Sequence, residues 1–403
     1  MKIGILREGK VPPDERVPLT PRQCKALHEL YPTLEITVQP SKIRAYRDKS
    51  YLKHGITLNE DLSDCDVLLG VKEVNIHDLI PDKKYLFFSH TYKMQPYNRK
   101  LLKAILDKKI QLIDYELLTD KNKVRLVAFG YYAGIVGAYN GLRGWGEKFG
   151  AFNLKPAHDC HDKVELEEQL KTIRFRKPIK ILITGYGRVA TGAVEILILS
   201  GIEKVPVDDF LEKQFGKTVY AQAHVKHYNK RKSDGGFEQP EFFNNPSGYV
   251  SDFNKFSQCT DLFIACHYWD SRASFLFTRA DAKSKDFNIK MVADISCDID
   301  GPIASTLRPS SIAAPFYGYD PINEVECDFN NKNAIGVMAV DNLPCELPRD
   351  ASDFFGNAMV ESIIPALLGN DPDKMIERAS ETNLSGGLMP DYNYLEAYIK
   401  GES

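Results

Sequence analysis

The chain has 403 residues, a formal net charge of −3 at pH 7 and 43% hydrophobic residues. A chain of this length usually folds as two domains, each large enough to bury a core. The nearly balanced charge argues against partners such as nucleic acids or acidic membrane surfaces. No apolar stretch reaches the roughly 18 residues that a membrane-spanning helix needs. The eight cysteines are scattered singly and the start lacks a secretion-signal pattern, so we expect reduced thiols and a cytoplasmic location.

The first 130 residues alternate between short apolar runs and helix-like segments. Runs that predict strands lie at residues 3–6, 34–38, 67–71, 85–89 and 110–114. A helix is predicted to begin at Thr20-Pro21, because threonine caps helix N-termini and proline fits the first helical position. A long helix rich in small residues is predicted over residues 130–150, as a crossover between domains. This alternation is typical of a parallel sheet that is covered by helices.

A glycine-rich turn lies between a strand-like run at residues 181–183 and a helix-like segment at residues 188–200. It has the pattern G-x-G-x-x-A from Gly185 to Ala190. In dinucleotide-binding units the first glycine permits the tight turn, and the second lets a pyrophosphate approach the backbone. The phosphates then meet the N-terminus of the helix. The turn predicts dinucleotide binding at Gly185 and Gly187, and a plain tight turn between strand and helix is the alternative.

The second half of the chain continues the alternation. Strands are predicted at residues 219–225, 261–266, 290–295 and 335–339, with a polar loop or surface insertion at residues 226–248 and a last long helix near residues 353–368. We therefore predict an α/β fold with two Rossmann-like domains that flank a central cleft. Residues 1–135 with 351–403 form the substrate domain, and residues 136–350 form the dinucleotide-binding domain. The pattern leaves the oligomeric state open, because buried helices and subunit-contact helices look alike.

Three successive predicted strands in the first half end in ionisable residues. Lys72 and Glu73 follow the first, His90 and Lys93 follow the second, and Glu116 follows the third. The carboxyl ends of parallel strands lie at one edge of the sheet, which places these side chains together. A histidine, and a lysine in a cleft of low dielectric, are suited to acid–base catalysis near neutral pH. Ordinary solvated loop residues are the alternative.

Aromatic and acidic residues follow the strands of the second half. Tyr268, next to His267, is a candidate to pack on a nicotinamide or adenine ring, or simply a core residue. The aspartates near Asp298 raise a metal hypothesis, but Asp-Gly-Pro is also an ordinary turn, so no metal is predicted. Asp208 and Asp209 lie at the distance from Gly187 that suits a ribose hydroxyl. Basic residues after the run 219–225 suit a 2′-phosphate instead, so NAD and NADP both stay open.

Taken in order, several segments resemble the alanine dehydrogenase / N-terminal transhydrogenase superfamily. They are residues 4–8 and 15–21, Val71-Lys72-Glu73, residues 88–93, residues 114–118 and 125–134, and residues 340–355. Within that superfamily the last three segments are most similar to the lysine-forming saccharopine dehydrogenases. The glycine turn, G-Y-G-R-V-A, departs from the G-A-L-G-type turn of those enzymes, and the 205–260 region is longer. The resemblance therefore implies the type of reaction more firmly than the substrate.

The resemblance implies an NAD-linked oxidoreductase that cleaves a secondary amine, as in saccharopine plus water giving lysine and 2-oxoglutarate. Lys72 and His90 are the implied catalytic residues. The implied substrate-binding residues are Arg16, Glu73, Lys93, Glu116 and Arg125. The implied cofactor-binding residues are Gly185, Gly187, Arg188, Val189, His267, Tyr268, Asp298, Asp341 and Leu343. The partner is then a small amino-acid substrate. Alanine dehydrogenase-type oxidative deamination and a non-catalytic NAD(H)-binding module are the alternatives.

Overall fold

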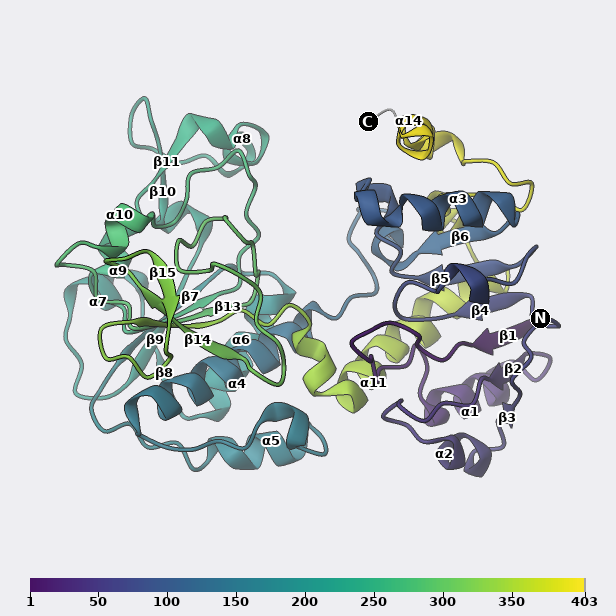
Figure 1. The fold of residues 1–403 in the computed structure, drawn as a ribbon, viewed down its shortest axis with the longest axis horizontal. Helices are drawn as coiled ribbons and strands as arrows, with labels where there is room; N and C mark the ends of the chain where they lie inside the picture. Colours follow the sequence, from purple (N-terminus) through teal and green to yellow (C-terminus); the bar gives the residue numbers. More distant parts are fainter. Residues whose placement is uncertain (402–403) are drawn as a thin grey trace. The chain divides into compact units, whose positions relative to one another are not determined.

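The computed structural model describes residues 1–401, which divide into two compact units. Unit 1 contains Met1–Phe129 and the segment that begins at Pro348, and unit 2 contains Gly130–Leu347. Each unit is built around its own sheet (Figure 1). The α/β class with Rossmann-type units is confirmed.

Unit 1 has a six-stranded parallel sheet in the order β3-β2-β1-β4-β5-β6. Its strands are β1 (Lys2–Ile5), β2 (Glu35–Val38), β3 (Thr57–Leu58), β4 (Val67–Leu69), β5 (Lys84–Phe87) and β6 (Gln111–Asp114). Its helices are α1 (Pro21–Leu30), α2 (Asp48–Lys53), α3 (Arg99–Asp107), α11 (Pro348–Ala358), α12 (Ile364–Leu367), α13 (Met375–Arg378) and α14 (Leu395–Lys400). The strand order reverses between β1 and β4, and ligands bind open α/β sheets at such a reversal, beyond the carboxyl ends of the strands.

Local sequence explains where α1 begins. The Thr20 side chain accepts a hydrogen bond from the backbone N–H of Gln23, the Gln23 side chain accepts one from the backbone N–H of Thr20, and Pro21 occupies the first turn. This reciprocal pair satisfies backbone donors that the helix itself leaves unpaired. The predicted start of this helix is thus present.

Unit 2 has an eight-stranded sheet in the order β15-β14-β16-β13-β12-β7-β9-β8. Its strands are β7 (Lys180–Thr184), β8 (Glu203–Lys204), β9 (Val219–Ala223), β12 (Leu262–Ala265), β13 (Met291–Asp294), β14 (Phe316–Asp320), β15 (Val325–Cys327) and β16 (Ile335–Met338). Its helices are α4 (Gly130–Phe149), α5 (Lys163–Leu170), α6 (Arg188–Leu199), α7 (Val207–Glu212), α8 (Gln239–Asn244), α9 (Asn254–Ser257) and α10 (Arg279–Ala282). Every residue of β7, β9, β12 and β13 is buried, so this part of the sheet forms the centre of the core.

Small residues let α4 lie directly against α6. A Cβ atom added to Gly134 would come within 1.9 Å of the Val189 carbonyl oxygen, and one added to Gly192 would come within 2.1 Å of the Tyr131 carbonyl oxygen. The two backbones therefore pack without side chains between them. The helix α6 begins directly after the glycine turn. The contact with α4 therefore holds the N-terminus of α6 in place.

Three predicted elements differ from the structure. β14 pairs antiparallel with both β15 and β16, so the sheet of unit 2 is mixed rather than wholly parallel. The region 226–248 is not a plain loop, because it contains α8 and β10 (Asn229–Arg231), which pairs antiparallel with β11 (Tyr249–Ser251). The last long helix is interrupted by a π-helical segment, Met359–Ile363, just before Pro365. Proline lacks the N–H that a continuous α-helix needs, which explains the interruption.

Candidate functional site

Glu8, just after β1, joins two strand ends of unit 1. Its carboxylate accepts hydrogen bonds from the backbone N–H groups of Val71 at 2.7 Å and Lys72 at 2.9 Å. Burial, and then the negative charge of Asp14, raise the pKa of Glu8 to about 7. The loops after β1 and β4 are thus tied together directly at the backbone of Lys72.

Glu73 binds two basic side chains at the same edge. One carboxylate oxygen lies 2.9 Å from His90 Nδ1, and the other lies 2.6 Å from Lys10 Nζ. Burial opposes the ionised form, but the hydrogen bonds from His90 and Lys10 outweigh it and lower the pKa of Glu73 to about 2. The Glu73 contact assigns His90 Nδ1 a proton and leaves Nε2 as the nitrogen that can exchange one with a substrate.

Glu116 is the centre of a second polar cluster. Its carboxylate accepts hydrogen bonds from Lys93 Nζ at 2.6 Å, from Arg125 at 3.1 Å and from the Tyr92 hydroxyl at 2.6 Å. These contacts lower the pKa of Glu116 to about 2 despite its burial. The Arg125 guanidinium also lies over the Phe88 ring, 5.3 Å from its centre. Three of the predicted substrate-binding residues therefore form one ion-paired group.

Arg16 is held by a bidentate ion pair with Asp14. Its Nε and Nη2 atoms lie 3.0 and 2.6 Å from the two carboxylate oxygens, and both side chains are buried. The guanidinium stacks over the Phe129 ring, 4.1 Å from its centre. The charge of Arg16 holds the pKa of Asp14 well below its usual range although burial opposes this. A guanidinium fixed in this way is preorganised to bind a carboxylate.

Unit 1 thus brings five of the predicted residues into two polar clusters, Glu73 with His90 and Glu116 with Lys93 and Arg125. Sequence reasoning missed Glu8, Lys10 and Asp14. The signal for Glu8 was present, because Glu8 closely follows the first predicted strand, at residues 3–6, and ligand residues follow strand ends. Asp14 carried no such signal, because its role depends on a contact within an irregular loop.

In unit 2 the two glycines of the turn differ in how much space surrounds them. Gly185 has φ 94°, and a Cβ atom there would lie 2.8 Å from the Cys266 carbonyl oxygen. At Gly187, which caps α6, an added Cβ atom would meet nothing within 4 Å, and no side chain caps the helix. The first glycine is required by close packing, and the second leaves room above the N-terminus of α6, where a phosphate is stabilised.

The other predicted cofactor residues differ in exposure. Arg188 and Asp341 are exposed, and Val189 and Asp298 are half-buried. Tyr268 is 91% exposed, so it is not a core residue. Leu343 is buried, and its side chain lies near Gly137 of α4, so only its backbone is available to a ligand.

His267 is buried at the end of β12. Its Nδ1 lies 2.7 Å from the Thr184 hydroxyl, and burial lowers the pKa of the ring to about 4, so the ring is neutral at pH 7. Within residues 1–401 its Nε2 atom is buried without a hydrogen-bond partner. A buried polar atom of this kind is unusual in folded proteins and is often completed by a ligand.

The end of β9 is basic. His224 and Lys226 follow this strand, and Lys204 on β8 lies 6.0 Å from the centre of the Tyr186 ring, which itself lies 5.4 Å from the His224 ring. Burial and the charge of Lys226 lower the pKa of His224. Asp208 and Asp209 lie on α7, ahead of β9 rather than at its end. The spacing argument for these two aspartates as ribose ligands is therefore weakened.

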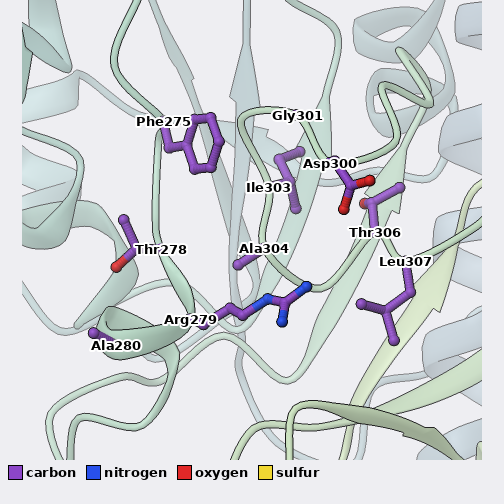
Figure 2. Close-up of a pocket in the computed structure, with 10 residues that line it drawn as sticks. All are labelled: Phe275, Thr278, Arg279, Ala280, Asp300, Gly301, Ile303, Ala304, Thr306 and Leu307. Atoms are coloured by element: carbon purple, nitrogen blue, oxygen red, sulfur yellow. The ribbon is translucent and has the colours of Figure 1, made fainter.

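Unit 2 also contains a cavity of about 380 Å³, lined by segments that follow β12 and β13. Phe275, Ile303 and Leu307 give it apolar walls, and Figure 2 shows the Arg279 side chain extending among them. Arg279 is also 3.3 Å from Glu324. The cavity has the size of a small-ligand site, but none of the predicted site residues lines it.

Metal-binding clusters and membrane-spanning helices are both absent from residues 1–401. No cluster of three or more histidine, cysteine, aspartate or glutamate side chains in this part of the chain has the arrangement of a metal site. Within the same residues, no helix has both the length and the apolar character needed to cross a membrane.

Comparison with known proteins adds independent evidence. Residues 4–136 match the family model described as alanine dehydrogenase/PNT, N-terminal domain. The chain is 31% identical to the mitochondrial alpha-aminoadipic semialdehyde synthase of Bos taurus, over 98% of this chain and 47% of that protein. It is 26% identical to saccharopine dehydrogenase [NAD(+), L-lysine-forming] of Schizosaccharomyces pombe, over 89% of this chain and 91% of that enzyme. The chain thus spans about half the length of the bovine relative.

A solved structure shows the same fold. L-alanine dehydrogenase superposes with a TM-score of 0.66 over 99% of this chain and 100% of that chain, at 17% sequence identity. The family match, the two relatives and this fold all agree with the resemblance found in the sequence. These findings confirm the resemblance to the alanine dehydrogenase / N-terminal transhydrogenase superfamily, by the family model for residues 4–136 and by the shared fold for the whole chain.

Proposed function

We propose that this chain is a nicotinamide-dependent amino acid dehydrogenase of the lysine-forming saccharopine dehydrogenase type. Its reaction joins lysine and 2-oxoglutarate through a secondary amine, or cleaves that amine. The similarity to saccharopine dehydrogenase over 89% of this chain supports the choice of reaction. The observation that carries the proposal is the cluster at the strand ends of unit 1, where Glu73 contacts both His90 and Lys10.

In the cleavage direction, an oxidised dinucleotide held at Gly185 and Gly187 would supply the hydride acceptor for the carbon next to the substrate nitrogen. That nitrogen loses its proton to Lys72, and the substrate becomes an imine. Water adds to the imine carbon, and the carbon–nitrogen bond then breaks to give the 2-oxo acid and the free amine. His90 moves protons in the water-addition and bond-breaking steps, using the nitrogen that does not face Glu73. The net balance is saccharopine, NAD(P)⁺ and water giving lysine, 2-oxoglutarate, NAD(P)H and a proton.

The substrate carries carboxylates that need fixed cations. We assign one to Arg16, because its pair with Asp14 and its stacking on Phe129 hold the guanidinium in one orientation. We assign another to the group formed by Arg125 and Lys93, whose charges Glu116 only partly neutralises. Bidentate arginine–carboxylate contacts supply orientation as well as affinity.

Unit 2 fits the dinucleotide. The turn at Gly185 and Gly187 leaves the N-terminus of α6 open, and the unpartnered Nε2 atom of His267 next to it suits a ligand hydroxyl. The histidine and lysine after β9 favour a coenzyme with a 2′-phosphate, although the resemblance by itself favours NAD. The relative named for NAD(+) supports NAD(H) binding, and we propose that the basic end of β9 lets the protein bind NADP(H) as well.

We also propose that the enzyme works in a reducing compartment, the cytoplasm. All eight cysteines are free thiols, and burial raises the pKa of Cys65 to about 11 and of Cys297 to about 12. Such thiols stay protonated at neutral pH and are slow to oxidise.

The decisive assay follows reduced-coenzyme absorbance with lysine and 2-oxoglutarate, using NADPH and NADH in parallel. We expect turnover that requires both substrates. Turnover with pyruvate and ammonia instead would identify an alanine dehydrogenase-type enzyme. Tight coenzyme binding without turnover on any amine and 2-oxo acid pair would identify a non-catalytic module, and either result would overturn the proposal.

A further inference from the structure

A segment near the C-terminus pairs with β6 and places a carboxyl group beneath the His90 loop. The backbone N–H of Asp114 donates to the Ala379 carbonyl at 3.1 Å, and that of Glu381 donates to the Leu112 carbonyl at 2.8 Å. The Glu381 side chain is fully buried, as are those of Asp114, Ser89 and Thr91. Two carboxyl groups from distant parts of the chain thus lie in one buried polar cluster.

The two hydroxyl groups that flank His90 connect these carboxyl groups. The Ser89 hydroxyl lies 2.6 Å from Asp114 Oδ2, and it also lies 2.6 Å from the Thr91 hydroxyl. The Thr91 hydroxyl lies 2.8 Å from Glu381 Oε2. The result is a continuous chain of oxygen atoms, from Glu381 through Thr91 and Ser89 to Asp114.

Counting protons shows what this chain requires. Three of its oxygen–oxygen contacts are 2.8 Å or shorter, and each of these needs one hydrogen between its two oxygens. The hydroxyls of Ser89 and Thr91 supply one hydrogen each. The third must belong to a carboxyl group, since otherwise two oxygens would face each other in the interior without a proton.

The backbone decides which carboxyl group holds that proton. Asp114 accepts hydrogen bonds from the backbone N–H groups of Ser89 at 2.8 Å, His90 at 3.3 Å and Glu116 at 2.7 Å. Several backbone donors stabilise an ionised carboxylate. Glu381 receives only hydroxyl contacts from Ser89 and Thr91. The proton therefore lies on Glu381, and the charge lies on Asp114.

We propose that Glu381 is a positioning residue that holds a proton at neutral pH and, through Thr91 and Ser89, locks the backbone of His90. His90 is in the left-handed region, with φ 56°, which a histidine rarely adopts without support. The ionised Asp114 supplies that support at the His90 backbone N–H. The effect of Glu381 on catalysis rests on the proposed role of His90. The presence of a proton on Glu381 does not depend on that role.

The electrostatic surroundings agree with this assignment. Burial, and then the charge of Asp114, raise the pKa of Glu381 to about 8. Burial also raises the pKa of Asp114, but the hydrogen bonds from Ser89 and Glu116 oppose this rise and favour the ionised form, and Glu381 has no backbone donors of this kind. The phenols of Tyr392, Tyr394 and Tyr398 face Glu381 from the C-terminal segment, and their own pKa values are raised. Above about pH 8 a second negative charge forms beside Asp114, and the hydrogen-bonded chain loses one proton.

The first test measures thermal unfolding and does not depend on activity. The folded state holds a proton on Glu381 that the unfolded state releases near its ordinary pKa, so the native protein loses stability as pH rises from about 4.5 to about 8. In Glu381→Gln the side chain is a neutral hydrogen-bond donor that does not titrate. This variant therefore does not lose stability in this way as pH rises. Its Tm relative to wild type should rise by about 5 °C between pH 5.5 and pH 9.

The matched control is Glu377→Gln, since Glu377 is an exposed carboxylate four residues earlier. Its Tm difference from wild type should stay the same across this pH range. A difference for Glu381→Gln that does not change with pH overturns the proposed proton on Glu381, whether or not the enzyme turns over.

The second test measures kinetics with the substrates established for the protein. Glu381→Gln should match wild-type kcat within about twofold at pH 7, and the ratio of its kcat/KM to that of wild type should rise at least threefold by pH 9.5. Glu381→Leu, which has a similar volume but no polar atoms, should lower kcat at least tenfold with little change in KM. Equal pH profiles for wild type and Glu381→Gln, or no rescue by glutamine relative to leucine, overturn the positioning role.

Discussion

At the scale of single residues, Glu73 is the carboxylate that contacts His90 and sets the charge around it. It lies between His90 and Lys10 and is mostly buried, with 11% of its side chain exposed. It therefore fixes both the position of the imidazole and the nitrogen that carries the proton. A neutral amide at this position keeps the shape but removes the charge.

We predict that Glu73→Gln lowers kcat by about 10- to 100-fold, less than the roughly 100- to 10,000-fold that an acid–base group itself supplies, because His90 stays in place. The dependence of Tm on pH should change too. The pKa of Glu73 is lowered to about 2, so its ionised form stabilises the fold above pH 4.5 and this contribution is lost as pH falls toward 2. Initial rates at pH 7 and melting curves from pH 2.5 to pH 6 check this. Glu60→Gln, at an exposed ion pair with Arg7, should leave kcat and the pH dependence of Tm unchanged.

Lys226 tests the coenzyme assignment. If the end of β9 holds a 2′-phosphate, Lys226→Ala should weaken NADPH binding about fivefold, corresponding to roughly 1 kcal/mol for one phosphate contact, and leave NADH binding nearly unchanged. Binding titrations at two salt concentrations check this, because the NADPH contact should weaken as salt rises. Equal effects on both coenzymes would contradict the assignment. Lys217→Ala, at an exposed ion pair with Glu203, is the matched control.

At the scale of elements, the contact between α4 and α6 determines how the glycine turn is presented. Gly134→Ala would place a methyl group 1.9 Å from the Val189 carbonyl oxygen, so the helices must separate. We predict destabilisation by about 1–3 kcal/mol, as in other overpacked cores, together with weaker coenzyme binding. Chemical denaturation and coenzyme titration measure the two effects. Gly216→Ala, where an added Cβ meets nothing within 4 Å, should change neither.

The elements also show what the sequence could predict. The strand, glycine turn and helix at residues 180–199 were predictable, because both glycine spacing and hydrophobic pattern are local. The buried strands that precede Lys72 and His90 were predictable for the same reason. β14 and β15 were not, because strand direction within a sheet depends on distant pairing. The position of Glu381 was equally hidden, since it depends on a backbone pairing with β6 across more than two hundred residues.

At the scale of the whole molecule, unit 2 is one continuous stretch, Gly130–Leu347, with its own sheet and core. We predict that this stretch, expressed alone, folds and binds the reduced coenzyme without turnover. Circular dichroism melting and coenzyme fluorescence check this. Gly185→Ala in the same fragment should abolish binding, because φ 94° and the nearby Cys266 carbonyl both oppose a side chain. A fragment that folds but binds equally well with alanine would contradict the placement of the site.

Unit 1, by contrast, is made from two separated stretches, and Glu381 belongs to the second. During synthesis the His90 loop therefore emerges long before the carboxyl group that locks it, and all of unit 2 is made in between. The proposed coenzyme-binding unit is complete before the loop of His90 gains its last support. The order of the chain thus places the synthesis of unit 2 between that of the His90 loop and that of Glu381.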